Sequence, residues 1–88
     1  MKLILAIVQD SDSGVILETL INSGFNVTRI SATGGILKRS QATFLIGTAD
    51  EKVQECIQII REHTVTTINP GIKHVTIFVL KVEHFEQV

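Results

Sequence analysis

The chain begins with MKLILAIVQDSDSGVILETLINSG (residues 1–24), and the pattern of this stretch decides the fold class. Lys2–Gln9 is almost continuously aliphatic, which is typical of a central strand covered on both faces. Helix-capping side chains follow, and apolar residues then recur at helical spacing, so a helix is predicted over roughly Ser13–Ser23. Gly24 stands where a left-handed residue ends a helix. The stretch therefore predicts a strand followed closely by a helix.

The rest of the chain continues this alternation. Phe25–Ala32 and Gln41–Gly47 have the pattern of two paired strands, and His74–Val82 predicts a final strand. Thr48 and Glu51 have capping-box spacing, which predicts the start of a second helix. The apolar stripe of that helix consists of Val53, Cys56, Ile57 and Ile60. The order of elements predicts an α+β, ferredoxin-like βαββαβ fold, with a four-stranded antiparallel sheet and two helices on one face.

Length and composition indicate a single domain, residues 1–88, that associates with copies of itself. A chain this short buries only about 60% of its unfolded surface, so a lone monomer is marginally stable. Yet 44% of the residues are hydrophobic, which is a large share for so small an interior. The predicted sheet also has one face without helices. We expect another copy of the chain to cover it.

Charge and cysteine usage exclude several classes of protein. Eight basic residues nearly balance nine acidic ones, and there is no Trp or Tyr, so the chain lacks the basic, aromatic stripe of a nucleic-acid groove. The N-terminal apolar run ends at Gln9, too early for a signal peptide with a cleavage site or for a membrane span. Cys56 is the only cysteine, which fits a reducing compartment. We expect a soluble, cytoplasmic protein that binds neither nucleic acid nor membrane.

Residues that could carry catalysis or hold a metal do not form a convincing site. Cys56 lies on the apolar face of the second predicted helix, where an inert core thiol is expected. Three histidines lack the spacing of a metal site: His63, His74 and His84. Three aspartates lie at predicted helix starts, where a capping role is sufficient: Asp10, Asp12 and Asp50. The sequence therefore predicts neither an enzyme nor a bound metal or cofactor.

Four ordered segments, residues 1–13, 27–37, 42–53 and 76–87, resemble the cyclic di-AMP receptor family of PII-like signalling proteins. The register is kept without gaps through about Ile60. The resemblance implies a bacterial homotrimer with three equivalent clefts between neighbouring subunits. Relatives bind cyclic di-AMP in these clefts, have no known catalytic apparatus and pass the signal to a downstream protein, which the sequence does not identify here.

The resemblance, together with the chemistry of the residues themselves, gives a set of candidate ligand-binding residues: Thr28, Gly35, Ile36, Leu37, Lys38, Arg39, Gln41, Gly47 and Gln87. Thr28 would bond a base edge or phosphate, although an ordinary strand residue has the same appearance. The pair Gly34-Gly35 would bring backbone amides to a phosphate, or would simply form a bulge or turn. The basic pair Lys38-Arg39 would neutralise phosphates, or would remain solvated. Ile36 would cover a base, or pack on the neighbouring subunit.

The sequence departs from the family pattern at several of these positions. Gly24 replaces an Asn, and Asn26 replaces an Arg whose charge it cannot reproduce. Ile36 replaces a Phe, so an aromatic surface for adenine is lost. Gln41 replaces an Asn, and the loop before the last strand is shortened to about Thr64–Ile72. These departures predict weak binding of cyclic di-AMP and favour another compact nucleotide or anion.

Three functional hypotheses remain open at this point. The leading one is a nucleotide-sensing, signal-transducing trimer that binds cyclic di-AMP or a related nucleotide between subunits. The alternative is a trimeric interaction protein that has lost the ligand and acts through its surface. The third is a small enzyme, because ferredoxin-like folds also host catalysis. The sequence offers no convincing pair of residues for that chemistry.

Overall fold

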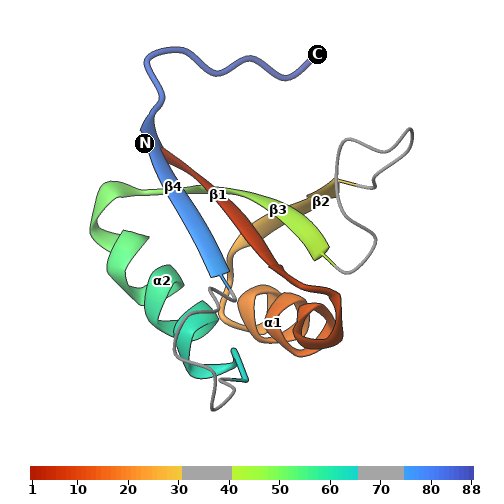
Figure 1. The fold of residues 1–88 in the computed structure, drawn as a ribbon. Coiled ribbons are helices and arrows are strands. Elements are labelled where there is room, and N and C mark those ends of the chain that lie inside the picture. The colour runs from red at the N-terminus through yellow and green to blue at the C-terminus, as the bar shows by residue number, and fades with distance from the viewer. Residues whose placement is uncertain (31–40, 66–74) are drawn as a thin grey trace.

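The computed structural model describes residues 1–30, 41–65 and 75–88, and its elements follow the predicted order (Figure 1). They are β1 (Lys2–Gln9), α1 (Asp10–Asn22), β2 (Asn26–Ile30), β3 (Gln41–Thr48), the short 3-10 helix η1 (Asp50–Lys52), α2 (Val53–Glu62) and β4 (Val75–Lys81). The strands form one antiparallel sheet in the order β2-β3-β1-β4. Both helices lie on one side of the sheet, and the C-terminal tail passes on the other. The predicted α+β fold is confirmed.

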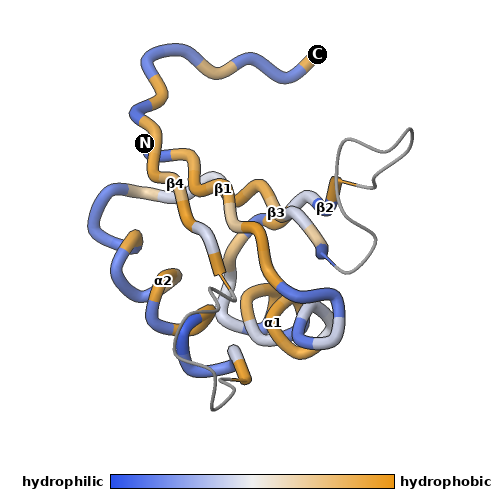
Figure 2. The backbone as a smooth tube through the Cα atoms, in the orientation of Figure 1, coloured by the Kyte–Doolittle hydropathy of each residue, from blue (hydrophilic) through white to orange (hydrophobic). Residues whose placement is uncertain are grey.

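The core lies between the sheet and the two helices. On β1, Ile4, Ala6 and Val8 are at most 1% exposed and point to this side. The antiparallel register brings them opposite Ile46, Phe44 and Ala42 of β3, all of which are buried. Hydrophobic residues run continuously along β1, as Figure 2 shows, and every second one belongs to the core.

The opposite, helix-free side is called the open face below. Leu3, Leu5 and Ile7 alternate with the core residues of β1 and are only half buried. The central position predicted for Lys2–Gln9 is confirmed. Within the single chain the helices cover one face of β1 only, and the cover of the other face by another copy stays a prediction.

Helix α1 begins at Asp10, three residues before the predicted Ser13. The predicted capping by a side chain is also wrong, because Gln9 occupies the N-cap position and no side chain bonds the free amides. Ser13 instead donates its hydroxyl to the Asp10 carbonyl at 2.7 Å. At the other end, Gly24 has φ 92°, so the predicted left-handed residue after the helix is confirmed.

The capping box predicted at Thr48 and Glu51 does not form. Thr48 is the last residue of β3, where it pairs with Lys2 and is 8% exposed. Ala49 takes the N-cap position of η1, and no side chain bonds its amides. The pairing with β1 therefore holds Thr48 in the sheet, away from the helix that it was expected to cap. The apolar stripe predicted for α2 is confirmed, with Val53, Cys56 and Ile60 buried.

Strand boundaries differ by one residue from the prediction where both can be compared, and β3 ends at Thr48 rather than Gly47. Strand β2 starts at Asn26 and β4 spans Val75–Lys81, while Ala32 and His74 lie outside the described residues. Most of the predicted loop Thr64–Ile72 also lies outside them. After β4, the Val82 amide donates to the Met1 carbonyl at 3.2 Å, and the tail continues without helix or strand. The start of the tail is thus attached to the start of β1.

The burial of Phe44 provides a test of the core. We expect Phe44→Ala to lower the free energy of unfolding by about 3–5 kcal/mol, because the fully buried ring leaves a cavity between β3 and the helices. Val15→Ala is the control, since Val15 is 55% exposed on α1 and its loss should cost within about 0.5 kcal/mol. Urea unfolding at one protein concentration measures both, and equal midpoints would contradict this placement of the core.

Candidate functional site

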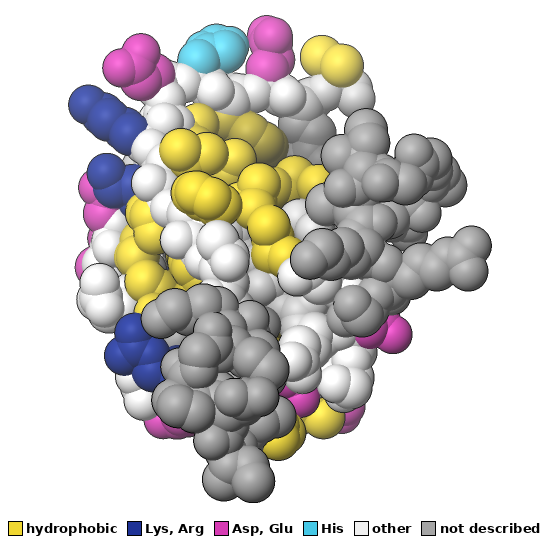
Figure 3. Space-filling view, in the orientation of Figure 1, with side chains coloured by type: hydrophobic (Ala, Val, Ile, Leu, Met, Phe, Trp, Pro, Cys, Tyr) yellow, Lys and Arg dark blue, Asp and Glu magenta, His cyan; other side chains and the backbone are white. Residues whose placement is uncertain are grey.

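A groove of about 720 Å³ lies on the open face, between the sheet and the C-terminal tail. Its walls come from β1, β2, β3 and the tail: Met1, Leu3, Asn26, Val27, Thr28, Leu45, Gly47, Val82, His84, Phe85 and Gln87. Figure 3 shows hydrophobic side chains gathered over the sheet beneath the tail. The groove thus joins segments from both ends of the sequence.

The register of the strands explains which residues face the groove. Leu3 and Asn26 both pair with Gly47, so the three positions form a row across the sheet. Thr28 pairs with Leu45 in the next row on the same face. Because side chains alternate along each strand, all five positions lie on the open face. The groove therefore has an apolar floor with polar groups along the edge strand β2.

Gly47 leaves room at the floor of the groove. A Cβ added at this position would lie 3.0 Å from the Met1 Cε atom, closer than ordinary van der Waals contact. The missing side chain therefore lets the Met1 thioether lie over β3. Gly47 thus permits a close approach of the Met1 side chain to β3.

A smaller cavity of about 230 Å³ adjoins the groove and shares Asn26 and Gly47 with it. Its other walls are the turn after α1 and the connection from β3 to η1: Ser23, Gly24, Phe25, Thr48, Ala49 and Lys52. Lys52 is engaged by Glu55, with 3.3 Å between Nζ and a carboxylate oxygen. Asn26 is therefore the side chain that faces both spaces.

Charge around the groove is paired. The Met1 ammonium donates a hydrogen bond to Asp50 at 3.0 Å, and this bond lowers the pKa of the Asp50 carboxyl below its ordinary 3.8. Arg29 binds Asp10 at 2.9 Å on the helix side of the sheet, away from the groove. Among the described residues, no Lys or Arg side chain lines the groove. Its described walls offer hydrogen-bonding and apolar contacts rather than fixed positive charge.

The structure brings together three of the residues that the sequence nominated: Thr28, Gly47 and Gln87. Gln41 lies elsewhere, since it is the first residue of β3 and pairs with Gln9 at the opposite end of the strand from Gly47. The remaining five nominated residues lie outside the described residues: Gly35, Ile36, Leu37, Lys38 and Arg39. The groove thus contains part of the nominated set.

Several groove residues were missed by the sequence analysis. Met1 and Leu3 were taken only as strand residues, and the alternation that places Leu3 beside Gly47 could have identified it. Asn26 was noticed only as a departure from the family pattern. His84 and Phe85 carried no signal, because the tail has neither helical nor strand periodicity.

The other reactive side chains have structural partners. Cys56 is fully buried, and desolvation, reinforced by the charge of Glu55, raises the pKa of its thiol to about 11, as expected for an inert core cysteine. The three aspartates expected to cap helices instead bind Arg29, the Val65 amide and the Met1 ammonium: Asp10, Asp12 and Asp50. Each of the three aspartates therefore has a structural partner.

Within residues 1–30, 41–65 and 75–88, no three His, Cys, Asp or Glu side chains lie close enough to hold a metal ion. In the same residues, no helix has the length and apolar character needed to cross a membrane.

Comparison with known proteins relates most of the chain to a family of receptors. The family model described as cyclic-di-AMP receptor matches residues 1–69, which include β1, β2 and β3. A crystal structure of a protein from Pediococcus pentosaceus ATCC 25745, described as functionally unknown, is similar over the whole fold. It shares 34% sequence identity, covers 99% of this chain and 96% of its own, and has a TM-score of 0.80. The similarity therefore includes β4 and the tail, beyond the end of the family match.

Proposed function

The chain belongs to the cyclic-di-AMP receptor family, and we propose that it is a nucleotide-sensing signalling protein whose ligand binds in the groove of the open face. The observation that carries this proposal is the meeting of Thr28, Gly47 and Gln87 in one groove. These residues come from two strands and the tail, and the resemblance nominated all three. Their common function in the proposal is binding and signalling rather than catalysis.

The chemistry of the groove supports a nucleotide as the ligand. Its volume lies within the range of about 300–1,000 Å³ that is typical of small-molecule sites. Leu3 and Leu45 offer an apolar surface for a base, while Thr28 and Gln87 offer hydrogen bonds to base edges, sugar or phosphate. This combination of an apolar slot and a few polar groups is what a planar, polar-edged ligand requires.

We further propose a homotrimer in which neighbouring subunits complete the site. The open face carries exposed apolar side chains that solvent disfavours, among them Phe78 at 52% and Leu80 at 49% exposure. Phosphate binding also requires positive charge, which the described walls of the groove do not supply. In the proposal, Lys38 and Arg39 of the connector between β2 and β3 provide that charge.

The neutral side chain of Asn26 supports the proposal that cyclic di-AMP itself is not the preferred ligand. Its side chain faces both the groove and the adjoining cavity, where the family pattern has a longer, charged Arg. A neutral amide at this position forms weaker bonds to a phosphate than a guanidinium does. We therefore propose a related nucleotide as the ligand, with cyclic di-AMP binding weakly.

The first prediction concerns assembly. Light scattering after size exclusion should give about three times the 9.7 kDa mass of the chain. A monomer whose mass does not change with concentration would contradict both the trimer and a site completed by neighbouring subunits. A trimer that binds no member of a nucleotide panel would instead favour an interaction protein without a ligand.

The second prediction concerns the Thr28 hydroxyl. For any panel nucleotide that binds, Thr28→Val should weaken binding about tenfold, because it removes about one neutral hydrogen bond and keeps the β-branched shape. Thr76→Val is the matched control, since Thr76 is exposed on the same sheet face, opposite Ile7 and outside the groove. Calorimetry measures both, and equal affinities for parent and Thr28→Val would move the site elsewhere.

The third prediction concerns the charge missing at Asn26. Asn26→Arg should raise the affinity for cyclic di-AMP by about 10–100-fold, because a guanidinium facing the groove adds a charge-assisted hydrogen bond. Asn22→Arg adds the same charge at the exposed end of α1, outside both cavities, and should change the affinity little. Equal effects of the two substitutions would show that general electrostatic attraction, rather than a contact in the groove, raises the affinity.

A further inference from the structure

The C-terminal tail is weakly attached to the sheet that it crosses. Val82 donates its amide to the Met1 carbonyl, and this is the last bond between the tail and the sheet among the described residues. Beyond it, the structure records within these residues only the His84–Glu86 pair, at 3.9 Å and inside the tail itself. Residues 83–88 are all exposed. Few contacts therefore oppose a movement of this segment toward or away from the groove.

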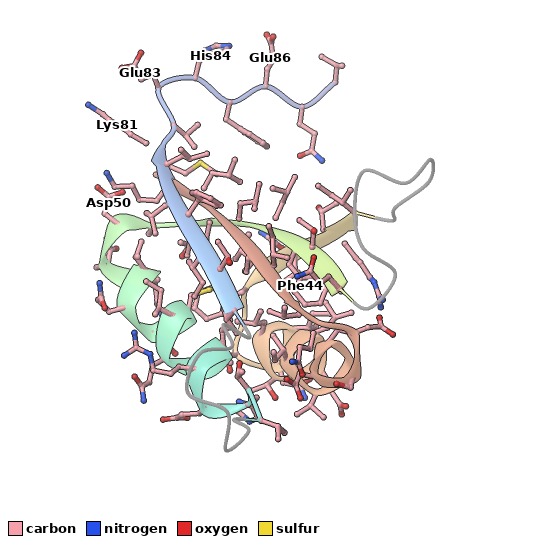
Figure 4. All side chains as sticks on the ribbon, in the orientation of Figure 1. Phe44, Asp50, Lys81, Glu83, His84 and Glu86 are labelled. Atoms are coloured by element: carbon pink, nitrogen blue, oxygen red, sulfur yellow. The ribbon has the colours of Figure 1, made fainter. Side chains whose placement is uncertain are left out.

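The tail presents alternate side chains to the groove. Figure 4 shows His84 and Glu86 pointing away from the body of the protein, and Glu83 does the same. Phe85 and Gln87 alternate with His84 and Glu86 along the tail. Both line the groove. The tail thus places one aromatic ring and one amide opposite the floor of the site.

Among the described residues that line the groove, Phe85 is the one Phe. The chain has four Phe and no Trp or Tyr, and Phe25 and Phe44 are buried in the core. Phe78 lies on the open face opposite Leu5, but it is not part of the groove wall. Phe85 lines the groove and is 63% exposed, so most of its side chain contacts water. A large exposed ring is costly in water unless it has a surface to cover.

The opposite wall is suited to receive a flat ring below Phe85. Leu3 and Leu45 form an apolar floor on neighbouring strands, with Thr28 at its edge. An aromatic ring above and aliphatic side chains below create a slot whose polar groups lie at the rim. A nucleobase has this distribution of chemistry, with apolar faces and hydrogen-bonding edges.

We infer that Phe85 stacks on the base of the bound nucleotide and that the tail closes over it as the outer wall of the groove. This inference rests on the proposed function, because it names the contact that selects for a base. Stacking on a ring tolerates different bases, since every base has a π-face. Closure also orders the exposed tail, which reduces the net gain in affinity.

The test compares Phe85→Ala with Phe85→Tyr and Val88→Ala, using calorimetry with cyclic di-AMP, cyclic di-GMP, ATP and inorganic pyrophosphate. Phe85→Ala should weaken binding of each nucleotide that the parent binds by about 10–100-fold and leave pyrophosphate unaffected. Phe85→Tyr keeps the ring and should keep the affinity. Val88→Ala removes an exposed apolar side chain of the same tail, outside the groove, and should have no effect.

The outcomes separate this inference from the function on which it rests. If the parent binds none of the three nucleotides, both fail. If the parent binds a nucleotide and Phe85→Ala binds it equally well, stacking alone is wrong. Equal weakening of nucleotide and pyrophosphate binding would also refute stacking, because it would mean that the tail supports the site without contacting a base.

Hydrogen exchange supplies an independent readout of closure. Within the described residues, no backbone hydrogen bond protects the amides of residues 83–88, so they should exchange at nearly the unprotected rate in the free protein. Saturation with a nucleotide that binds should slow their exchange in the parent, and much less so in Phe85→Ala. Unchanged exchange in the ligand-bound parent would refute closure of the tail.

Discussion

The pairing of β1 with strands on both sides is the constraint on which the rest of the structure depends. Its residues are in register with β3 along Lys2–Gln9 and with β4 along Lys2–Val8. A shift of one residue in either pairing would move every side chain of the neighbouring strand to the other face. In the pairing with β3, such a shift would expose Phe44 and Ile46 and turn Gly47 toward the helices. The same register therefore places the core residues on one face of the sheet and the groove residues on the other.

This arrangement divides the functions of the sheet between its faces. The helix side holds the buried residues, including an unreactive cysteine, and supplies stability. The open side holds the groove, where polar side chains stand beside exposed apolar ones. Stability and the proposed recognition of a ligand thus depend on alternate residues of the same strands. A substitution can change the chemistry of the open face while leaving the core side chains in place, which is how the departure at Asn26 is tolerated.

The sequence predicted the elements better than the contacts between them. The aliphatic run of Lys2–Gln9 and the position of Gly24 were sufficient for the strand and the helix end, because both signals are local. The helix start and the capping box failed because they depend on distant pairing: Thr48 is held by its partner on β1. For the groove, the resemblance nominated Thr28, Gly47 and Gln87. Phe85 was missed because the tail forms neither helix nor strand, so no sequence period predicts which side chains face the sheet.

The edges of the sheet have a consequence for how the chain must be handled during synthesis. In the described sheet, β4 is the last strand on its side, and it carries exposed side chains at Phe78, Val79 and Leu80. An unpaired strand with such side chains is a template on which another strand can add. A newly made chain whose β4 edge is uncovered is therefore open to irregular, fibre-like growth. Any contact that covers this edge competes with aggregation, so the speed with which it forms affects the yield of folded protein.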